Sequence, residues 1–340
     1  MRTFPVLPDH LGSVAIIDAL GLNDPFDPPA DGSDFADGVV AAAHGAGPGF
    51  DAVATLLADD GFDFSTGPVI EQYKDTDYAK GGNGGGNGKG GNGGGHDGGG
   101  SGDPVLSEYA SGGADGDAGF DILIDFKGSG WTADLQQAFI DAADYLTSVI
   151  TNDTGPGTRY RGTNIDDLYI TAELSDIDGS GGILGQAGPT ATWTASDLTA
   201  AGVMQFDIAD AFDYASAGLW DEIVFHEMMH VVGFGSLWDF ERDLAPLNVE
   251  TGEYEYIGQN GLDAYNASLD PSADYIPVES SGFGAGTDGS HWDEDALGNE
   301  LMTGFIDTSN YVSEFSIVSL ADLGYVVAYA DYPYDEVPLV

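Results

Sequence analysis

Two histidines and a glutamate stand at a spacing typical of metal sites in the stretch HEMMHVVGFG, which begins at residue 226. His226 and His230 are four residues apart, so on a helix their rings project from one face, one turn apart. Both imidazoles could then reach one zinc ion, which binds histidine nitrogen at about 2.0–2.1 Å. Glu227 stands beside that face and could act as a general base toward a water molecule. The pattern therefore points to metal-assisted hydrolysis.

The helix expected to carry these residues is apolar nearly all round. Residues 219–233 read LWDEIVFHEMMHVVG, and the polar residues among them are Asp221, Glu222, Glu227 and the two histidines. A helix that is apolar on all sides is a buried one. In the ordinary alternative, the two histidines are core residues that each bond to a carbonyl group. Burying two imidazoles and a carboxylate without a compensating partner is costly, so the pattern favours a metal ion.

A catalytic zinc site needs a third protein ligand and one open position. Glu250 lies 20 positions after His230, a spacing similar to that of thermolysin-like enzymes, but its surroundings, LNVETGEYEYIG, indicate a loop or strand rather than a helix. His291, in DGSHWDEDALGNELMTGF, is the better candidate. Gly233 supports it, because glycine can take the positive φ that ends a helix sharply and turns the chain back under the metal.

Strands and helices around this helix must position the ligands. Hydrophobic periodicity predicts strands at 120–126, 168–174 and 203–209, an extended edge segment at 181–193, a helix at 131–150 capped by Thr132, and a last strand with a packed terminus in 325–340. The order of strand, helix, strands and then the histidine helix predicts a mixed α+β fold with helices packed on a sheet.

A glycine-rich tract divides the chain. In residues 81–102, 15 of 22 positions are glycine, which predicts a flexible linker. Residues 1–80 carry no recognisable chemistry and could be a propeptide or an accessory region. The catalytic residues fall in the remainder, 103–340, which we expect to form one metallopeptidase domain with subdomains at 103–234 and 235–340.

The composition excludes several classes of partner. The chain has 8 Lys+Arg against 58 Asp+Glu, a formal net charge of -50, so it repels nucleic acid and anionic lipid. No segment approaches the roughly 20 apolar residues of a membrane span. The absence of cysteine rules out disulfides, thiol catalysis and a cysteine-based zinc cage. The N-terminus lacks an apolar run of signal-peptide length, which predicts export without a cleaved signal.

Several stretches together resemble one family of peptidases. H-E-x-x-H-x-x-G, followed by a distant histidine and a methionine turn, looks like the metzincin clan. The short metzincin pattern fails, because Phe234, Gly235 and Ser236 occupy the gap where the third histidine would stand. The long pattern resembles leishmanolysin and its bacterial relatives. The matching stretches, which span roughly 118–330, are DIDGSGGILGQAGP, MQFDIAD, HEMMHVVGFGSLW, HWDEDALGNELMTG and SIVSLADLGYVV.

The resemblance implies a role for each matching residue. His226, His230 and His291 would be the zinc ligands, and Glu227 the catalytic general base. Met302 would form the methionine turn beneath the metal, packing there without binding it. The implied protein is a zinc endopeptidase of bacterial type that acts on proteins or peptides. Secretion is a separate expectation from composition, because the chain is acidic, rich in glycine and free of cysteine. Its metzincin-like fold would have a twisted sheet, two main helices including the active-site helix, and a C-terminal subdomain after the turn.

This sequence also departs from the family. The leishmanolysin prototype has many disulfides and a propeptide cysteine that keeps the zymogen inactive, and this chain has no cysteine. Any latency would therefore come from residues 1–80 by other means. The segment GILGQAGP corresponds to the family's edge strand, where an extended substrate would pair with the sheet.

Two acidic loops leave a further possibility open. The loops DIDGSGG (176–182) and DGDAGFD (115–121) could bind calcium, or they could be plain Asp-Gly turns. Acidic pairs arise often by chance in a chain with 58 acidic residues, which favours turns. The alternative from another class is a non-enzymatic, calcium-loaded adhesion module that retains a metal site. In either case we expect a monomer.

Overall fold

The computed structural model describes most of the C-terminal two thirds of the chain. The described residues are 14–15, 104–112, 119–160, 163–177, 179–180, 183–239, 242–280, 287–307 and 309–333. The predicted linker at 81–102 and all of 1–80 except residues 14–15 lie outside them, as does most of the loop at 115–121. The proposed domain limits therefore stay predictions.

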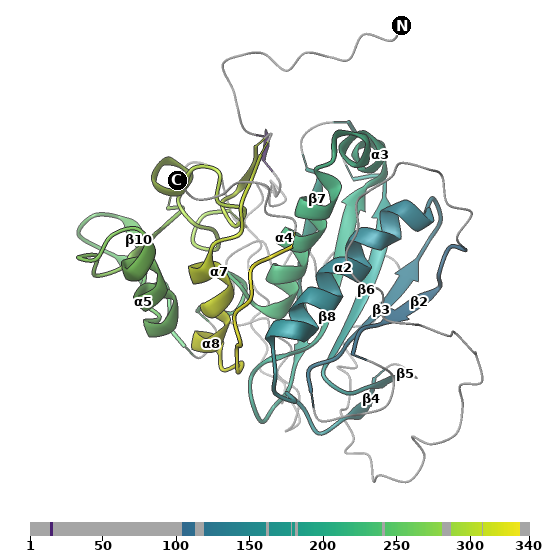
Figure 1. Cartoon of the computed structure of the whole chain (residues 1–340), viewed down its shortest axis with the longest axis horizontal. Helices are drawn as coiled ribbons and strands as arrows, with labels where there is room; N and C mark the ends of the chain where they lie inside the picture. Colours follow the sequence, from purple (N-terminus) through teal and green to yellow (C-terminus); the bar gives the residue numbers. More distant parts are fainter. Residues whose placement is uncertain are drawn as a thin grey trace, which may run out of the picture.

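A mixed sheet forms the first layer of the described part (Figure 1). Its strands run in the order β2-β3-β6-β8-β7. The bounds are β2 (Glu108–Ala110), β3 (Ile122–Lys127), β6 (Leu168–Ser175), β7 (Gly185–Thr192) and β8 (Thr199–Asp207). β3, β6 and β8 are parallel, whereas β2 and β7 run antiparallel to their neighbours. The strands predicted at 120–126, 168–174 and 203–209 and the extended edge segment are present, within a few residues of the expected ends.

Two helices, α2 (Ala133–Val149) and α4 (Trp220–Val232), cover one face of this sheet (Figure 1). Thr132 begins α2 as expected, because its hydroxyl accepts the N–H of Leu135 at 3.2 Å. The ring of Phe139 on α2 lies 5.5 Å from Phe126 of β3 and 5.4 Å from Phe206 of β8. Of the helices described, none is long and apolar enough to cross a bilayer. These layers confirm the mixed α+β fold.

A second, smaller cluster lies on the opposite face. Because side chains alternate along a strand, Ile170 of β6 joins the core under the helices while Tyr169 points the other way. There Tyr169 packs with residues of β7, β8 and a hairpin of β4 (Thr158–Tyr160) and β5 (Thr163–Ile165). The sheet is therefore covered on both sides.

The segment after α4 contains short elements. They are β9 (Leu247–Asn248), β10 (Glu253–Tyr256), α5 (Gln259–Ser268), β11 (Ile276–Val278), α6 (Glu294–Leu297), β12 (Phe305–Ile306), α7 (Glu314–Val318) and α8 (Leu320–Leu323). β9, β10 and β11 pair into a small sheet, and β1 (Val14–Ala15) pairs with β12. One hydrophobic cluster runs from Phe120 to Tyr332, so the two predicted subdomains share a core.

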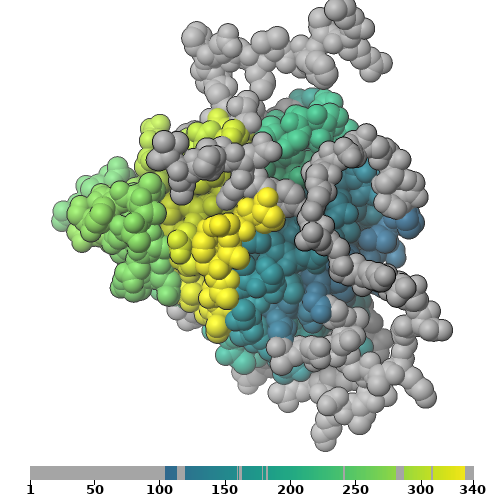
Figure 2. Space-filling model, viewed as in Figure 1, coloured from purple at the N-terminus to yellow at the C-terminus, as the bar shows by residue number. Residues whose placement is uncertain are grey.

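The predicted strand in the C-terminal tail is wrong for its described part. Residues 325–333 contain no strand, only a single bridge between Val327 and Ile150. Side chains hold the tail instead: the Tyr325 hydroxyl donates to the carbonyl of Val232 at 2.9 Å, and Tyr145 donates to that of Ala330 at 2.7 Å. The expected packing is present, and Figure 2 shows the yellow C-terminal segment lying against the blue-green one that contains α2.

The predicted strand at 203–209 ends earlier than expected. Asp207 accepts the N–H of Ala209 at 2.8 Å and so begins a helix, α3 (Ile208–Ala217). Side-chain oxygens of this kind satisfy free N–H groups at a helix start. The periodicity pattern missed this helix start, because Asp207 was not recognised as an N-cap within the apolar run.

Candidate metal centre

The helix α4 carries its polar residues into the protein interior. His226 and Glu227 are fully buried, and His230 is 2% exposed. The helix ends at Gly233, whose φ of 127° lies in the region that favours glycine. A Cβ atom there would lie 2.8 Å from a methyl group of Leu237. The expected sharp glycine end is confirmed.

Three backbone carbonyls orient the three histidine rings. The carbonyl of Leu301 lies 2.7 Å from Nδ1 of His226, and that of Phe234 lies 2.9 Å from Nδ1 of His230. Nδ1 of His291 lies 3.3 Å from the Thr287 carbonyl and 3.1 Å from the Ser290 hydroxyl, which can accept as well as donate. A carbonyl accepts only, so an Nδ1 that faces one carries the proton. Each Nε2 is consequently left with a lone pair.

The three Nε2 atoms converge on one point. Nε2 of His230 lies 2.9 Å from those of His226 and His291, which are 3.2 Å apart. With every Nδ1 protonated, no proton remains to bond one Nε2 to another. Lone pairs gathered in this way need a cation, and within the described residues these three histidines form a group that could hold a metal ion.

Burial keeps these rings neutral. It lowers the pKa of His230 to about 4, although the hydrogen bond to Phe234 acts in the opposite direction. Burial first, and then the neighbouring histidines, lower the pKa of His226 and His291 well below the usual range. Neutral imidazole is the form that binds a metal.

His291 is positioned by the segment between β11 and α6. Its carbonyl accepts the N–H of Glu279 at 2.9 Å, and the next residue, Trp292, donates its N–H to the carbonyl of Met302 at 3.0 Å. The ring is fully buried. The structure thus brings the distant histidine to the helix pair.

Glu250 takes no part in this group. It lies in the exposed turn between β9 and β10, where its N–H donates to the side chain of Asn248 at 3.0 Å. The surrounding hairpin confirms that this stretch is strand and turn rather than helix. The geometry favours His291 over Glu250 as a third ligand.

Glu227 is a buried carboxylate with neither oxygen hydrogen-bonded among the described residues. Burial raises its pKa well above the ordinary value. The first residue of β7 lies directly against it, because a Cβ atom on Gly185 would be 2.9 Å from Oε1. A buried carboxylate without partners, on the residue that follows His226, is suited to hold a proton during a reaction.

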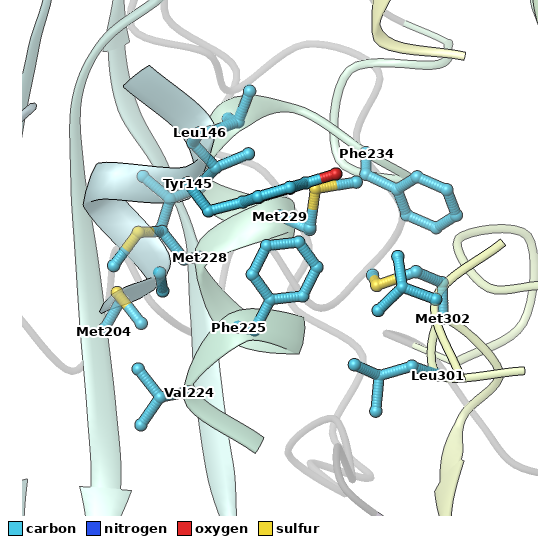
Figure 3. Packing of buried hydrophobic residues seen from close by; sticks show 14 of the residues in the cluster. Tyr145, Leu146, Met204, Val224, Phe225, Met228, Met229, Phe234, Leu301 and Met302 are labelled. Carbon is cyan, nitrogen blue, oxygen red and sulfur yellow. The ribbon is translucent and has the colours of Figure 1, made fainter. Parts of the chain in front are cut away.

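The residue predicted to form the methionine turn, Met302, lies in a turn of the chain. Met302 is fully buried and, with Leu301, faces α4 from the C-terminal side (Figure 3). In this view, Phe225 of α4 lies between Leu301 and Met302 on one side and Met204 and Met228, which are nearer the sheet, on the other. The turn therefore belongs to the same packed core as the helix.

The sequence profile of leishmanolysin matches residues 168–338. That stretch includes β7, the histidine helix, His291 and Met302. The chain belongs to the leishmanolysin family. Members of this family are metallopeptidases, so this leishmanolysin-family chain is a hydrolase of proteins or peptides, as the resemblance implied. No curated protein matches the chain.

The expected edge strand of this family member is present. In the described sheet, β7 pairs with β8 and ends the strand order, so its other edge has no strand partner there.

The calcium expectation gains no support. In the described part of 176–182, the N–H groups of Ile177 and Gly179 donate to Asp207 at 3.1 and 2.8 Å. Donors pointing at the carboxylate fit a turn, and no metal group of described residues includes this loop.

Three features of the site were not predicted from the sequence. They are the carbonyls that orient the rings, the approach of Gly185 to Glu227, and the buried carboxylate of Glu300 under the methionine turn. Backbone carbonyls have no residue signature. Glu300, by contrast, is an acidic residue directly before two apolar residues, Leu301 and Met302. An acidic side chain in such a stretch needs hydrogen-bond partners if it is buried, and this signal could have identified Glu300.

Proposed function

We propose that the chain is a zinc-dependent endopeptidase in which His226, His230 and His291 bind the metal and Glu227 is the general base. The observation that carries the proposal is the convergence of three unprotonated Nε2 atoms beside a carboxylate without partners. Their separations of 2.9–3.2 Å are close to the roughly 3.3 Å between nitrogens around a tetrahedral zinc ion. Three imidazoles leave the fourth position open, as in catalytic zinc sites.

The chain's own residues divide the work of peptide hydrolysis. Zinc, when bound, would polarise the peptide carbonyl and make water more acidic. Glu227 takes the proton of the attacking water and later returns it to the leaving amine. Burial raises the pKa of Glu227, which stabilises the carboxylic acid that holds the proton between the two steps.

The edge of β7 supports a way to align the substrate. An extended peptide can add to a free sheet edge through main-chain hydrogen bonds. β7 begins at Gly185, next to Glu227, so a peptide along this edge would bring its scissile bond to the base. We propose endopeptidase action because β7 runs on from Gly185 to Thr192, an edge long enough to pair with several residues of an extended chain.

Three broader expectations remain proposals. Secretion is supported by the net charge of -50 and the absence of cysteine. A monomeric state and a removable region at 1–80 rest on the sequence pattern alone.

The test is cleavage of casein by the full chain beside its Glu227→Gln variant, with zinc content measured on both. We expect the wild type to cut and a chelator to stop it. The variant should bind zinc equally but lose about 10²–10⁴-fold in rate, because the base is gone. A variant that cuts normally would refute the role of Glu227. If the zinc-loaded wild type does not cut even after removal of residues 1–102, the non-enzymatic metal-binding alternative holds instead.

A further inference from the structure

Glu300 is a fully buried carboxylate surrounded by donors. Its Oε2 accepts the N–H of Met302 at 2.5 Å. Its Oε1 accepts the N–H of Ser313 at 2.9 Å and lies 2.8 and 2.6 Å from the hydroxyls of Ser313 and Ser316. Burial raises the pKa of Glu300, and these hydrogen bonds act in the opposite direction. Such an acceptor network, fully satisfied, is rigid.

The loop that contains Leu301 and Met302 contacts the metal centre through two backbone carbonyls. The carbonyl of Leu301 receives Nδ1–H of His226 at 2.7 Å. The carbonyl of Met302 receives the N–H of Trp292, the residue after His291, at 3.0 Å. Glu300 bonds to the N–H between these two carbonyls, so it constrains the peptide groups that bear both.

A side-chain relay reaches the same residue. The indole Nε1–H of Trp292 donates to Oγ of Ser316 at 2.7 Å, and that hydroxyl donates to Glu300 at 2.6 Å. The indole is fully buried, so it has no water to replace this contact. One carboxylate is thus connected to Trp292 through both the main chain and a side chain.

We propose that Glu300 is a positioning residue of the metal centre: it fixes the Leu301–Met302 loop and, through it, the rings of His226 and His291. The inference rests on the proposed function, because ring positions matter only if the three histidines hold a metal. Residues that orient ligands in this way commonly change metal affinity when they are replaced.

The chemistry requires a carboxylate at this position. An amide has one acceptor oxygen, and its NH₂ group donates only. In Glu300→Gln, either orientation points this NH₂ group at a backbone N–H, that of Met302 or that of Ser313. The loop must then shift to relieve the contact, and the Leu301 carbonyl moves with it.

Asp167 offers a matched control in a different network. Its carboxylate, 1% exposed, accepts from Thr154 N–H at 2.5 Å, from the Thr154 hydroxyl at 2.9 Å and from Asp121 N–H at 2.9 Å. It shares no hydrogen-bond partner with Glu300. Asp167→Asn therefore makes the same change, a buried carboxylate to an amide facing donors, away from the metal ligands.

The experiment compares the full-length wild type with Glu300→Gln and Asp167→Asn, each titrated with zinc against a chromophoric chelator. We expect Glu300→Gln to raise the zinc dissociation constant about 10–100-fold. Asp167→Asn should stay within about threefold while it lowers the melting temperature, since independent sites do not couple. Loading with Co²⁺ adds a second readout: its visible absorption bands should change in Glu300→Gln and not in Asp167→Asn.

Ser316→Ala guards against a Glu300 variant that does not fold. It removes one relay hydroxyl and should raise the zinc dissociation constant about tenfold. Zinc affinities and Co²⁺ spectra equal to those of Asp167→Asn, in either variant, would overturn the inference and leave the proposed function standing. A wild type that binds no zinc would overturn both, because no metal centre would exist to position.

Discussion

Backbone carbonyls, not carboxylates, orient the three imidazole rings at the residue scale. Nδ1 faces the carbonyls of Leu301, Phe234 and Thr287, and at His291 the hydroxyl of Ser290 as well. A neutral partner fixes the tautomer without adding negative charge beside the ring. With no carboxylate behind a ring, a metal held there would keep more of its positive charge, which suits a site that must attract a peptide carbonyl.

The third ligand can be tested by single alanine substitutions. His291→Ala should reduce zinc binding by more than about 100-fold, since one of three nitrogen donors is lost. Glu250→Ala should bind zinc like the wild type, because its side chain is exposed in a turn. Equilibrium dialysis against buffered zinc measures both. The opposite pattern would favour the thermolysin-like alternative.

The contact between Gly185 and Glu227 allows a second substitution. In Gly185→Ala, the new methyl group would lie 2.9 Å from Oε1 of Glu227 and 3.0 Å from the ring of Phe206. A base displaced by about 1 Å can cost on the order of 100-fold in rate. We expect kcat to fall with zinc content unchanged.

Gly119→Ala is the control for that measurement. A Cβ atom on Gly119 meets nothing within 4 Å, and its φ is not in the glycine region. Its peptidase kinetics should match the wild type. Equal kinetics in both variants would mean that Glu227 tolerates the added methyl group.

The end of α4 is the feature that matters most at the scale of elements. Gly233 stops the helix, and the next residue presents the carbonyl that orients His230. Gly233 thus both ends the helix and sets the position of the carbonyl that orients His230. The same turn buries Phe234 and Leu237 against the core.

Gly233→Ala should therefore impair both stability and metal binding. The substitution strains the backbone at φ 127° and places a methyl group 2.8 Å from Leu237 and 3.0 Å from Leu323. We expect a loss of about 1–3 kcal/mol in the free energy of unfolding, together with weaker zinc binding. Thermal unfolding and zinc titration measure the two effects.

The variant Gly218→Ala is the control that adds backbone strain at a helix end other than that of α4. Gly218 ends α3 with φ 77°, and a Cβ atom there meets nothing within 4 Å. Its variant should lose stability through strain alone and keep its zinc affinity. Weakened zinc binding in both variants would show that the metal centre responds to stability in general.

The charge balance acts at the scale of the whole molecule. With 58 acidic and 8 basic side chains, most carboxylates have no cation to pair with, and repulsion among them opposes the compact state. Lys127 forms an ion pair with Asp125, and both lie on β3. Dissolved ions must supply the remaining screening.

Added salt should therefore stabilise the fold. Raising NaCl from low concentration to 1 M shortens the Debye length to about 3 Å. We expect an increase of roughly 3 °C or more in the melting temperature, equivalent to about 1 kcal/mol. CaCl₂ at equal ionic strength should give a similar increase if the acidic loops are plain turns. A much larger increase at micromolar calcium would instead reveal a specific calcium site.

Local chemistry made the elements of the first layer predictable. Thr132 begins α2 and Gly233 ends α4 through contacts within a few residues, which spacing alone reveals. The strands β3 and β6 follow from apolar residues that alternate along the chain. The tail was predicted wrongly because tyrosine favours strands, whereas the hydroxyls of Tyr145 and Tyr325 here donate to single backbone carbonyls of other segments.

The sequence by itself determined the part of the candidate site that lies on one helix: two histidines and a glutamate at fixed spacing. Only the tertiary structure decided that His291 and not Glu250 joins the helix pair, that Gly185 approaches Glu227, and that Glu300 supports the loop beneath. The physical reason is range. Spacing on one helix is set by its own geometry, whereas contacts between segments 60 or more residues apart depend on how all the layers pack.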